Sequence, residues 1–311
     1  NIVMSKILVT GGSGMVGTAL KCDLKDAVYV SSNDYNLIKR EDCEQMYMDH
    51  NPDYVIHLAA KVGGIKANMN KLANFYYDNT MISTNVLHYA KEYNVKKVLS
   101  VLSTCVYPDI VDYPLKEKDI HNGEPHSSNF AYAHVKRMID VQSRAYRKQY
   151  GCNFITVVPN NLFGENDNFH LDDSHVLPAI IRKIYEAKIN GSHVKLWGDG
   201  SPLREFTYSK DLSKIILFLL ENYNDKTPIN VGNTKEYSIK TVANMIAQIL
   251  DYKGDIFWQT NMPNGQYRKP SDDSKLRSLG WNSNNYTNFY DSLSSVCKWF
   301  SETYPNVRGI K

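Results

Sequence analysis

The sequence contains few cysteines and no long hydrophobic run. Its five cysteines, Cys22, Cys43, Cys105, Cys152 and Cys297, are scattered, and no two of them form a C-x-x-C pair. This number and spacing argue against both a disulfide framework and a zinc site. No apolar run approaches the roughly 18 residues of a membrane-spanning helix, and we expect no secretory leader. These absences predict a metal-free protein of a reducing compartment, the cytoplasm, with no membrane partner.

The chain also lacks an excess of charge of either sign. Lysine and arginine total 36 and aspartate and glutamate total 33, so the formal net charge is +3. So small an excess argues against a nucleic-acid-binding protein, although a local basic pocket for a phosphorylated small molecule is compatible with it. Hydrophobic residues make up 42% of the 311 residues, which excludes a disordered chain and favours a globular protein of about two domains.

Short apolar runs alternate with helical patterns in the first half of the chain. The runs that predict buried strands cover residues 6–10, 27–31, 53–59, 97–102 and 154–158. Helical patterns start after Gly14 and cover residues 40–50, 75–93 and 129–150. Strands that alternate with helices indicate a parallel, doubly wound α/β sheet with right-handed crossovers.

This alternation ends after Pro159. Residues 160–174 are rich in Asn, Asp and Gly and predict a loop, and helices are expected over 238–250 and 288–304. We interpret the second half as a smaller C-terminal α/β lobe. The predicted domains are a cofactor-binding domain of residues 4–160, joined by about 211–232, and a substrate-binding lobe of residues 161–210 and 233–311. The residues before Met4 are left out of this division.

A glycine motif lies between the first strand and its helix. Gly11, Gly14 and Gly17 follow the spacing G-x-x-G-x-x-G. Glycine permits a tight turn there and lets the backbone approach a pyrophosphate, which then sits on the amides at the helix N-terminus. Such a motif alone is a weak signal, and a simple strand-to-helix turn is the alternative. Its place on the first strand of an alternating chain favours dinucleotide binding.

The end of the second strand leaves the choice between NAD and NADP open. A carboxylate at the tip would bind the free ribose hydroxyls of NAD. The tip carries Ser31 and Ser32, which suit a phosphate better, with Asp34 further on. No arginine stands at this strand tip to select NADP. Lys39 and Arg40 are near the tip only in sequence.

A second group of residues suits the reduction of a carbonyl. Tyr132 and Lys136 lie four residues apart in a predicted helix and therefore share a face. An ammonium beside the tyrosine is expected to lower its pKa and make it a usable proton donor. Ser103 follows the fourth strand, where its hydroxyl can bond the same carbonyl, and Asn79 is a candidate to orient a water behind Lys136. Y-x-x-x-K also occurs by chance, and an incidental exposed pair is the alternative.

These residues together resemble the extended short-chain dehydrogenase/reductase family over nearly the whole chain. The resemblance implies a Rossmann domain that binds NADPH or NADP+, and a C-terminal lobe that closes over a nucleotide-sugar. Finer matches lie at residues 60–64, 103–108, 161–164, 167–169, 174–178 and 204–206. They resemble the GDP-L-fucose synthase family, the GDP-4-keto-6-deoxy-D-mannose 3,5-epimerase-4-reductases, in its eukaryotic form.

This resemblance implies a bifunctional oxidoreductase and isomerase of nucleotide-sugar metabolism. C3 and C5 of GDP-4-keto-6-deoxy-D-mannose would be epimerised and the C4 ketone then reduced with NADPH in one site, giving GDP-L-fucose. It implies Cys105 as the base and His175 as the acid. A cysteine that acts as a base must resemble a thiolate, so either its pKa must be lowered or its proton must pass to another group within the site. The alternatives are a small buried residue for Cys105 and a structural role at a helix start for His175.

The resemblance also implies the wider site. Further cofactor-binding residues would be Met15, Val16, Leu58, Ala59, Ala60, Asn79, Pro159 and Leu162. Substrate-binding residues would be Val62, Gly63, Ser103, Thr104, Asn161, His175, Lys183, Trp197, Arg204 and Lys269. Arg204 would bind the diphosphate, because the guanidinium matches phosphate oxygens. A homodimer is expected through the helices at 75–93 and 129–150, with Met138 and Ile139 as exposed apolar positions.

One loop departs from the family pattern. Glu165-Asn166 replaces the usual Pro-His, and this change is expected to alter sugar choice if the loop contacts the substrate. Three other nucleotide-sugar activities remain as alternatives: a 4-reductase, a single-centre epimerase or a 4,6-dehydratase. A catalytically inactive NADP-sensing module would be expected to lack part of the set Ser103, Tyr132 and Lys136, which is complete here.

Overall fold

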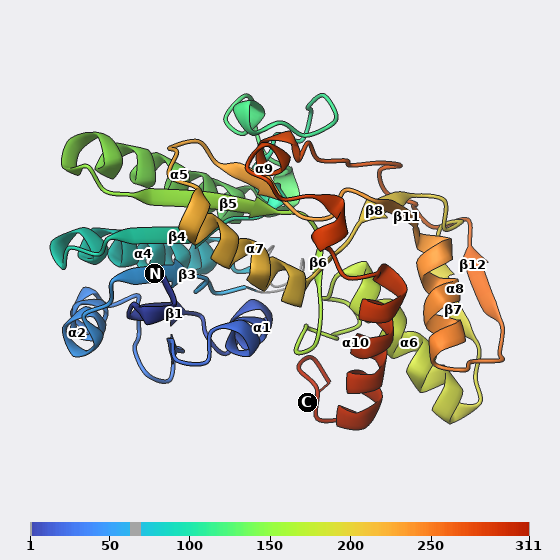
Figure 1. The fold of residues 1–311 in the computed structure, drawn as a ribbon. Helices are drawn as coiled ribbons and strands as arrows, with labels where there is room; N and C mark the ends of the chain where they lie inside the picture. Colours follow the sequence, from blue (N-terminus) through green and yellow to red (C-terminus); the bar gives the residue numbers. More distant parts are fainter. Residues whose placement is uncertain (1, 63–69, 311) are drawn as a thin grey trace.

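The computed structural model describes residues 2–62 and 70–310 and is built around one parallel sheet (Figure 1). The sheet has six strands in the order β10-β5-β4-β3-β1-β2, and every neighbouring pair is parallel. Its strands are β1 (Ile7–Thr10), β2 (Val28–Val30), β3 (Tyr54–His57), β4 (Lys97–Val101), β5 (Phe154–Pro159) and β10 (Ile229–Val231). The predicted doubly wound Rossmann sheet is confirmed.

Helices cover both faces of this sheet, which is why strands β1, β4 and β5 are buried along their whole length. The helices are α1 (Met15–Asp23), α2 (Arg40–His50), α4 (Leu72–Glu92), α5 (Phe130–Tyr150) and α7 (Ser209–Asn222). Alternate residues of β1 belong to opposite faces: Val9 packs with Leu212 of α7, whereas Leu8 packs in the cluster that contains Val86 of α4 and Ile139 of α5.

The strand order creates the crevice in which such sheets bind ligands. The chain runs from β1 outward to β2 and then crosses to β3 on the other side of β1. The connections that follow β1 and β3 therefore diverge at their carboxyl ends, and this divergence opens a crevice between them.

The second half of the chain forms a lobe with its own apolar core (Figure 1). Its helices are α6 (Val176–Asn190), α8 (Ile239–Ile249) and α10 (Phe289–Thr303), and a short α9 (Ser274–Ser278) lies beside β10. Three strand pairs complete the lobe: β6 (Leu162–Phe163) with β9 (Thr207–Tyr208), β7 (Val194–Trp197) with β12 (Ile256–Gln259), and β8 (Leu203–Glu205) with β11 (Glu236–Ser238). Between these parts the chain returns to the main sheet through α7 and β10.

Two expectations about these elements are wrong. Ile2, in the short helix η1 (Ile2–Met4), is buried in the apolar cluster that also contains Val9 and Leu20, so this residue takes part in the fold although it precedes Met4. Ile139 is also buried, because it faces the sheet, whereas the neighbouring Met138 is exposed as expected. The remaining short helices are η2 (Thr104–Val106), η3 (Glu117–Asp119), η4 (Ser127–Asn129) and η5 (Ser283–Asn285).

No helix within residues 2–62 and 70–310 has the length and apolar character needed to cross a membrane. Nor do these residues contain a group of three or more His, Cys, Asp or Glu side chains placed to hold a metal ion.

Candidate active site

The crevice at the ends of β1 and β3 contains a cavity of about 460 Å³, termed here the first cavity. Predicted cofactor-binding residues make up much of its wall: Gly11, Gly14, Met15, Val16, Gly17, Ser31, Ser32, Leu58, Ala59, Ala60, Tyr132 and Lys136. Two other predicted cofactor residues, Pro159 and Leu162, line a neighbouring cavity instead. These lining residues extend from the glycine turn to the tip of β2, as a site for a dinucleotide requires.

The reason why glycine is needed differs among the three positions of the motif. Gly11 has a φ of +66°, and a Cβ there would lie 2.8 Å from the backbone nitrogen of Ala59. A Cβ on Gly17 would lie 2.6 Å from the carbonyl oxygen of Gly12. Both are therefore required by the fold itself. A Cβ on Gly14 would meet only the Gly11 oxygen, at 3.4 Å, so the fold tolerates a side chain there. Gly14 instead leaves room for a ligand.

The N-terminus of α1 faces the same cavity. Gly14 is its N-cap residue and offers no side chain to bond the first helical amides. Those amides lack partners within the helix, and the helix dipole places partial positive charge beside them. The residues present therefore fit the diphosphate of a dinucleotide.

A buried hydrogen-bond chain fixes the opposite wall of the crevice. The Thr10 hydroxyl accepts bonds from the amides of Leu58 and Ala59, at 3.1 and 3.2 Å. It therefore donates its proton to Nδ1 of His57, 2.8 Å away, and Nε2 of His57 pairs with Ser83 at 3.3 Å. Burial lowers the pKa of His57 to about 3, so the ring is neutral. His57 is thus structural.

The tip of β2 presents hydroxyls rather than a carboxylate to the first cavity. Asp34 accepts bonds from the amide and the hydroxyl of Ser31, at 2.8 and 3.2 Å, and does not line the cavity. Neither Lys39 nor Arg40 is among the lining residues.

A second cavity, of about 580 Å³, adjoins the first. It lies between the sheet edge and the C-terminal lobe, and the two cavities share Met15, Val62, Leu102 and Arg308 in their walls. Five of the predicted substrate residues line it: Val62, Ser103, Thr104, Asn161 and His175. A substrate bound there would adjoin a ligand of the first cavity at these shared residues.

Cys105 lies on the η2 turn that follows β4. Ser103 begins this turn, and its Oγ accepts a bond from the Cys105 amide at 3.4 Å. The buried Arg137 of α5 holds the end of the turn by donating from Nε to the Val106 carbonyl at 2.7 Å. Burial raises the pKa of Cys105, while Ser103, Lys136 and Arg137 act to lower it. The net result is a protonated thiol, so of the two routes to a basic cysteine the transfer of its proton within the site remains.

Tyr132 and Lys136 lie together on α5, as their spacing predicts. The Lys136 Nζ is 5.5 Å from the centre of the Tyr132 ring and donates to the Val101 carbonyl at 3.2 Å. Burial lowers the pKa of Lys136 to about 8 and raises that of Tyr132. The expected lowering of the tyrosine pKa is therefore wrong: the cost of burying a phenolate outweighs the nearby ammonium. Tyr132 is instead a protonated donor.

His175 is the N-cap residue of α6 and faces the second cavity. Its ring remains in contact with solvent through the open cavity, and crowding by the surrounding protein lowers its pKa. A helix N-terminus also disfavours an added positive charge. The free protein thus presents a neutral imidazole and a neutral thiol.

Several predicted residues lie outside both cavities. Asn79 accepts a bond from the Lys61 amide at 2.7 Å and donates to the carbonyls of Lys61 and Phe75, so it holds the loop after β3 and does not line the first cavity. Lys183, Trp197, Arg204 and Lys269 line neither cavity, and Cys105, the predicted base, also lies behind the lining residues Ser103 and Thr104 rather than in either wall. Gly63 lies outside the described residues.

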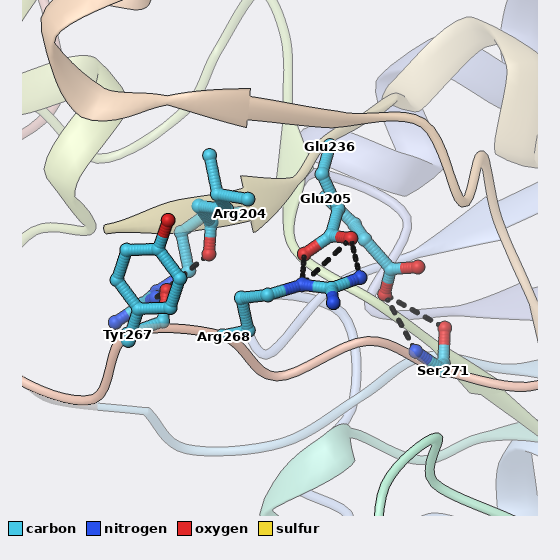
Figure 2. Close-up of polar contacts among 7 residues, drawn as sticks. Arg204, Glu205, Glu236, Tyr267, Arg268 and Ser271 are labelled. Atoms are coloured by element: carbon cyan, nitrogen blue, oxygen red, sulfur yellow. Dashed lines mark hydrogen bonds and ion pairs between the residues drawn. The ribbon is translucent and has the colours of Figure 1, made fainter. Parts of the chain in front are cut away.

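Arg204 and Lys269 nevertheless lie close enough to repel each other electrostatically. Figure 2 shows Arg204 on β8 beside Tyr267, where its Nη1 donates to the carbonyls of Leu203 and Tyr267, at 2.7 and 3.5 Å. The adjacent Arg268 is held differently, because it forms an ion pair with Glu236. Arg204 and Lys269 thus remain as a pair of cations without such a carboxylate partner among the described residues.

The loop that departs from the family pattern does not reach either cavity. Glu165 accepts hydrogen bonds from the Tyr208 and Ser295 hydroxyls, each at 2.8 Å, and so connects β9 to α10. Neither Glu165 nor Asn166 lines the two cavities. The expected effect of this loop on sugar choice therefore has no support in the geometry.

Several charged residues line the cavities without having been predicted from the sequence, among them Asp167 and Arg308. Asp167 is buried in the wall of the second cavity, and burial raises its pKa to about 7. Arg308 reaches the walls of both cavities from the C-terminal segment. The 167–169 motif was a signal for the aspartate, whereas nothing in the sequence marks Arg308.

Comparison with known proteins agrees with this geometry. The family described as "NAD dependent epimerase/dehydratase family" matches residues 7–232. A GDP-L-fucose synthase of Dictyostelium discoideum is 42% identical over 97% of each chain, and a GDP-L-colitose synthase of Yersinia pseudotuberculosis is 36% identical over 95% of this chain and 97% of its own. A crystal structure of a GDP-L-fucose synthetase from Naegleria fowleri bound to NADP is 38% identical, with a TM-score of 0.93 over 98% of this chain and 95% of that one. The chain belongs to the NAD-dependent epimerase/dehydratase family and, within it, to the GDP-L-fucose synthases.

Proposed function

We propose that the protein converts GDP-4-keto-6-deoxy-D-mannose to GDP-L-fucose with NADPH, by epimerisation at C3 and C5 followed by reduction at C4. The observation that carries this proposal is the pair of adjoining cavities. One has a dinucleotide's glycine turn and the donor Tyr132; the other brings Ser103 and His175 together beside it. Relatives that carry this function match nearly the whole chain.

NADPH is the cofactor, and the first cavity holds it. Gly14 and the amides of α1 would bind its diphosphate, and Ser31 and Ser32 would meet its adenosine end. When bound, it supplies the hydride that reduces the C4 ketone. The placement of Tyr132 and Lys136 in the same wall puts the proton donor beside that carbon.

Epimerisation requires a base on one face of the sugar and an acid on the other. The C4 ketone acidifies the C–H bonds at C3 and C5, so a side chain of modest basicity can remove either proton. In the proposed arrangement Cys105 removes the proton and His175 returns one to the opposite face. Since the free protein holds a thiol and a neutral imidazole, a proton must pass from Cys105 to His175 before this step. The total proton count of the pair is unchanged by that transfer.

Ser103 and Tyr132 stabilise the negative charge that develops on O4. Each hydroxyl can donate to this oxygen when the proton leaves C3 or C5. The same two donors serve the reduction, in which the Tyr132 proton moves to O4 as the carbonyl becomes an alcohol. Lys136, held by the Val101 carbonyl, then stabilises the phenolate that remains.

The C-terminal lobe, residues 161–210 and 233–311, is proposed to bind the nucleotide-sugar, with residues 4–160 and 211–232 as the cofactor domain. Asn161, Thr104 and Val62 line the sugar end of the second cavity. Arg204 and Lys269 are proposed to bind the GDP diphosphate. Lys183 is a further candidate phosphate contact, and the exposed Trp197 is a candidate stacking surface.

We also infer a cytoplasmic homodimer that pairs α4 and α5 with the same helices of a second copy. These two helices pack side by side. They expose Tyr76 and Tyr77 from α4 and Met138 and Val141 from α5. Large apolar side chains on the outer face of neighbouring helices suit an isologous interface.

The proposed function is tested by supplying GDP-4-keto-6-deoxy-D-mannose with NADPH and identifying the product by NMR. The expected product is GDP-L-fucose, formed with one NADPH oxidised per sugar. A 4-reduced sugar that keeps its original C3 and C5 configuration would identify a plain reductase. Inversion of one centre only would identify a single-centre epimerase. No oxidation of NADPH with this sugar would contradict the proposal.

A further inference from the structure

The C-terminal segment folds back onto the loop between β6 and α6 (Figure 1). The Phe169 amide donates to the Arg308 carbonyl at 2.9 Å, and Nη1 of Arg182 donates to the carbonyls of Phe169 and Gly309, at 3.0 and 3.2 Å. The preceding Val307 is buried in the core of the C-terminal lobe. The backbone on both sides of Arg308 is therefore fixed.

Gly309 allows this close approach. Its φ is +94°, and a Cβ there would lie 2.4 Å from the His170 amide nitrogen and 2.5 Å from Oδ1 of Asn168. A side chain at this position would therefore push the segment away from the loop. The packing fixes the direction in which Arg308 leaves the backbone.

The Arg308 side chain lies where the two cavities meet. It is exposed and lines both of them, together with Met15, the first residue of α1. Within the described part of the chain, no hydrogen bond or ion pair holds its guanidinium. The buried carboxylate of Asp167 feels its charge but forms no ion pair with it. Arg308 therefore has a fixed backbone and an unpaired guanidinium, which is available to bind a ligand.

We propose that Arg308 binds the diphosphate of the dinucleotide cofactor, opposite the N-terminal amides of α1. This inference rests on the proposed function, because it takes the first cavity to hold a dinucleotide. The guanidinium and the helix N-terminus would then approach one anion from different lobes. Cofactor binding would thereby couple the C-terminal segment to the Rossmann sheet. The same chemistry would suit the diphosphate of the nucleotide-sugar, since Arg308 also lines the second cavity.

The test is an equilibrium titration of the full chain with NADPH, followed by its fluorescence without any sugar present. Arg308→Gln should weaken NADPH binding about tenfold, and Arg308→Lys should recover part of the loss. Lys298→Gln, which removes a positive charge from the exposed face of α10, is the matched control and should bind NADPH as the wild type does. Thermal melting checks that each variant is folded.

Gly309→Ala provides a second, independent arm. It keeps the guanidinium but displaces its backbone, so it should weaken NADPH binding by a similar factor. The double variant Arg308→Gln/Gly309→Ala should bind no worse than Arg308→Gln alone, because both changes remove one contact. Losses that multiply in the double variant would contradict the inference.

Parallel titrations with GDP identify which diphosphate is bound. Weaker NADPH binding with unchanged GDP binding is the expected result for Arg308→Gln. Unchanged NADPH binding with weaker GDP binding would overturn the assignment to the cofactor and give Arg308 to the nucleotide-sugar. Unchanged binding of both would overturn the inference. Failure of the wild type to bind NADPH would instead contradict the proposed function.

Discussion

The two cavities are built in different ways. The wall of the first comes largely from residues at and after the ends of strands β1, β2 and β3, and its glycine turn depends on close backbone contacts. The wall of the second combines the turn after β4, the loop before α6 and the C-terminal segment, and its chemistry depends on side chains. A site made of backbone tolerates few substitutions but can serve many reactions. A site made of side chains from distant segments determines which reaction takes place.

Removing the Tyr132 hydroxyl, the proposed proton donor in the first cavity, should have the largest effect. Tyr132→Phe should lower kcat for NADPH oxidation about 1,000-fold, because O4 loses its proton donor. NADPH should bind as tightly as before, as measured by fluorescence titration. A kcat within about threefold of the wild-type value would show that Tyr132 is not the proton donor.

Removing the thiol should separate the two halves of the reaction. Cys105→Ala should slow deuterium exchange at C3 and C5 by about 100-fold or more while NADPH oxidation continues. The product would then keep the configuration of the starting sugar. Cys22→Ala, on the exposed face of α1, is the control. Normal exchange in the Cys105 variant would make that cysteine structural.

Two alanine substitutions distinguish the glycine that the fold requires from the glycine that NADPH binding requires. Gly17→Ala places a Cβ against the Gly12 backbone and should lower both the melting temperature and NADPH affinity, the latter about tenfold. Gly14→Ala places its Cβ only against the Gly11 carbonyl oxygen, at 3.4 Å, and should lower NADPH affinity with little change in melting temperature. Equal destabilisation by the two would show that Gly14 is also required by the fold.

The pH dependence of exchange should be the smallest effect. The pair needs one proton in total: His175 carries an extra one below its lowered pKa, and Cys105 loses its own above its raised pKa. Between these limits the rate should vary by less than about twofold, from pH 7 to pH 8.5, and then fall on both sides. A rate that climbs steadily through this range would mean that the thiolate form alone is required.

The sequence predicted the first cavity better than the second. The glycine turn and the strand ends belong to single segments, so periodicity and spacing locate Gly11, Ala59 and Tyr132. Arg308 was not predicted because its position depends on how a C-terminal segment packs against a loop about 140 residues earlier, where the Phe169 amide donates to the Arg308 carbonyl. The pKa values of Cys105 and Tyr132 escaped because they depend on burial, which a spacing rule does not contain.

Arg204 and Lys269 illustrate another limit. Resemblance placed them at the substrate, and the structure brings them near each other but outside both cavities. A nucleotide-sugar is long enough to extend beyond one cavity. Residues that bind its GDP part therefore need not line the cavity that holds its reacting carbon. A sequence gives no distance between such subsites.

The most direct test of the central claim, that one site epimerises and reduces, uses GDP-4-keto-6-deoxy-D-mannose and NADPH in D2O. NADPH oxidation is followed by absorbance, and the deuterium in the product is located by NMR. The account predicts GDP-L-fucose with solvent deuterium at both C3 and C5 and none delivered to C4. Oxidation of NADPH with no deuterium at C3 or C5 would contradict it, because the protein would then reduce the ketone without inverting either centre.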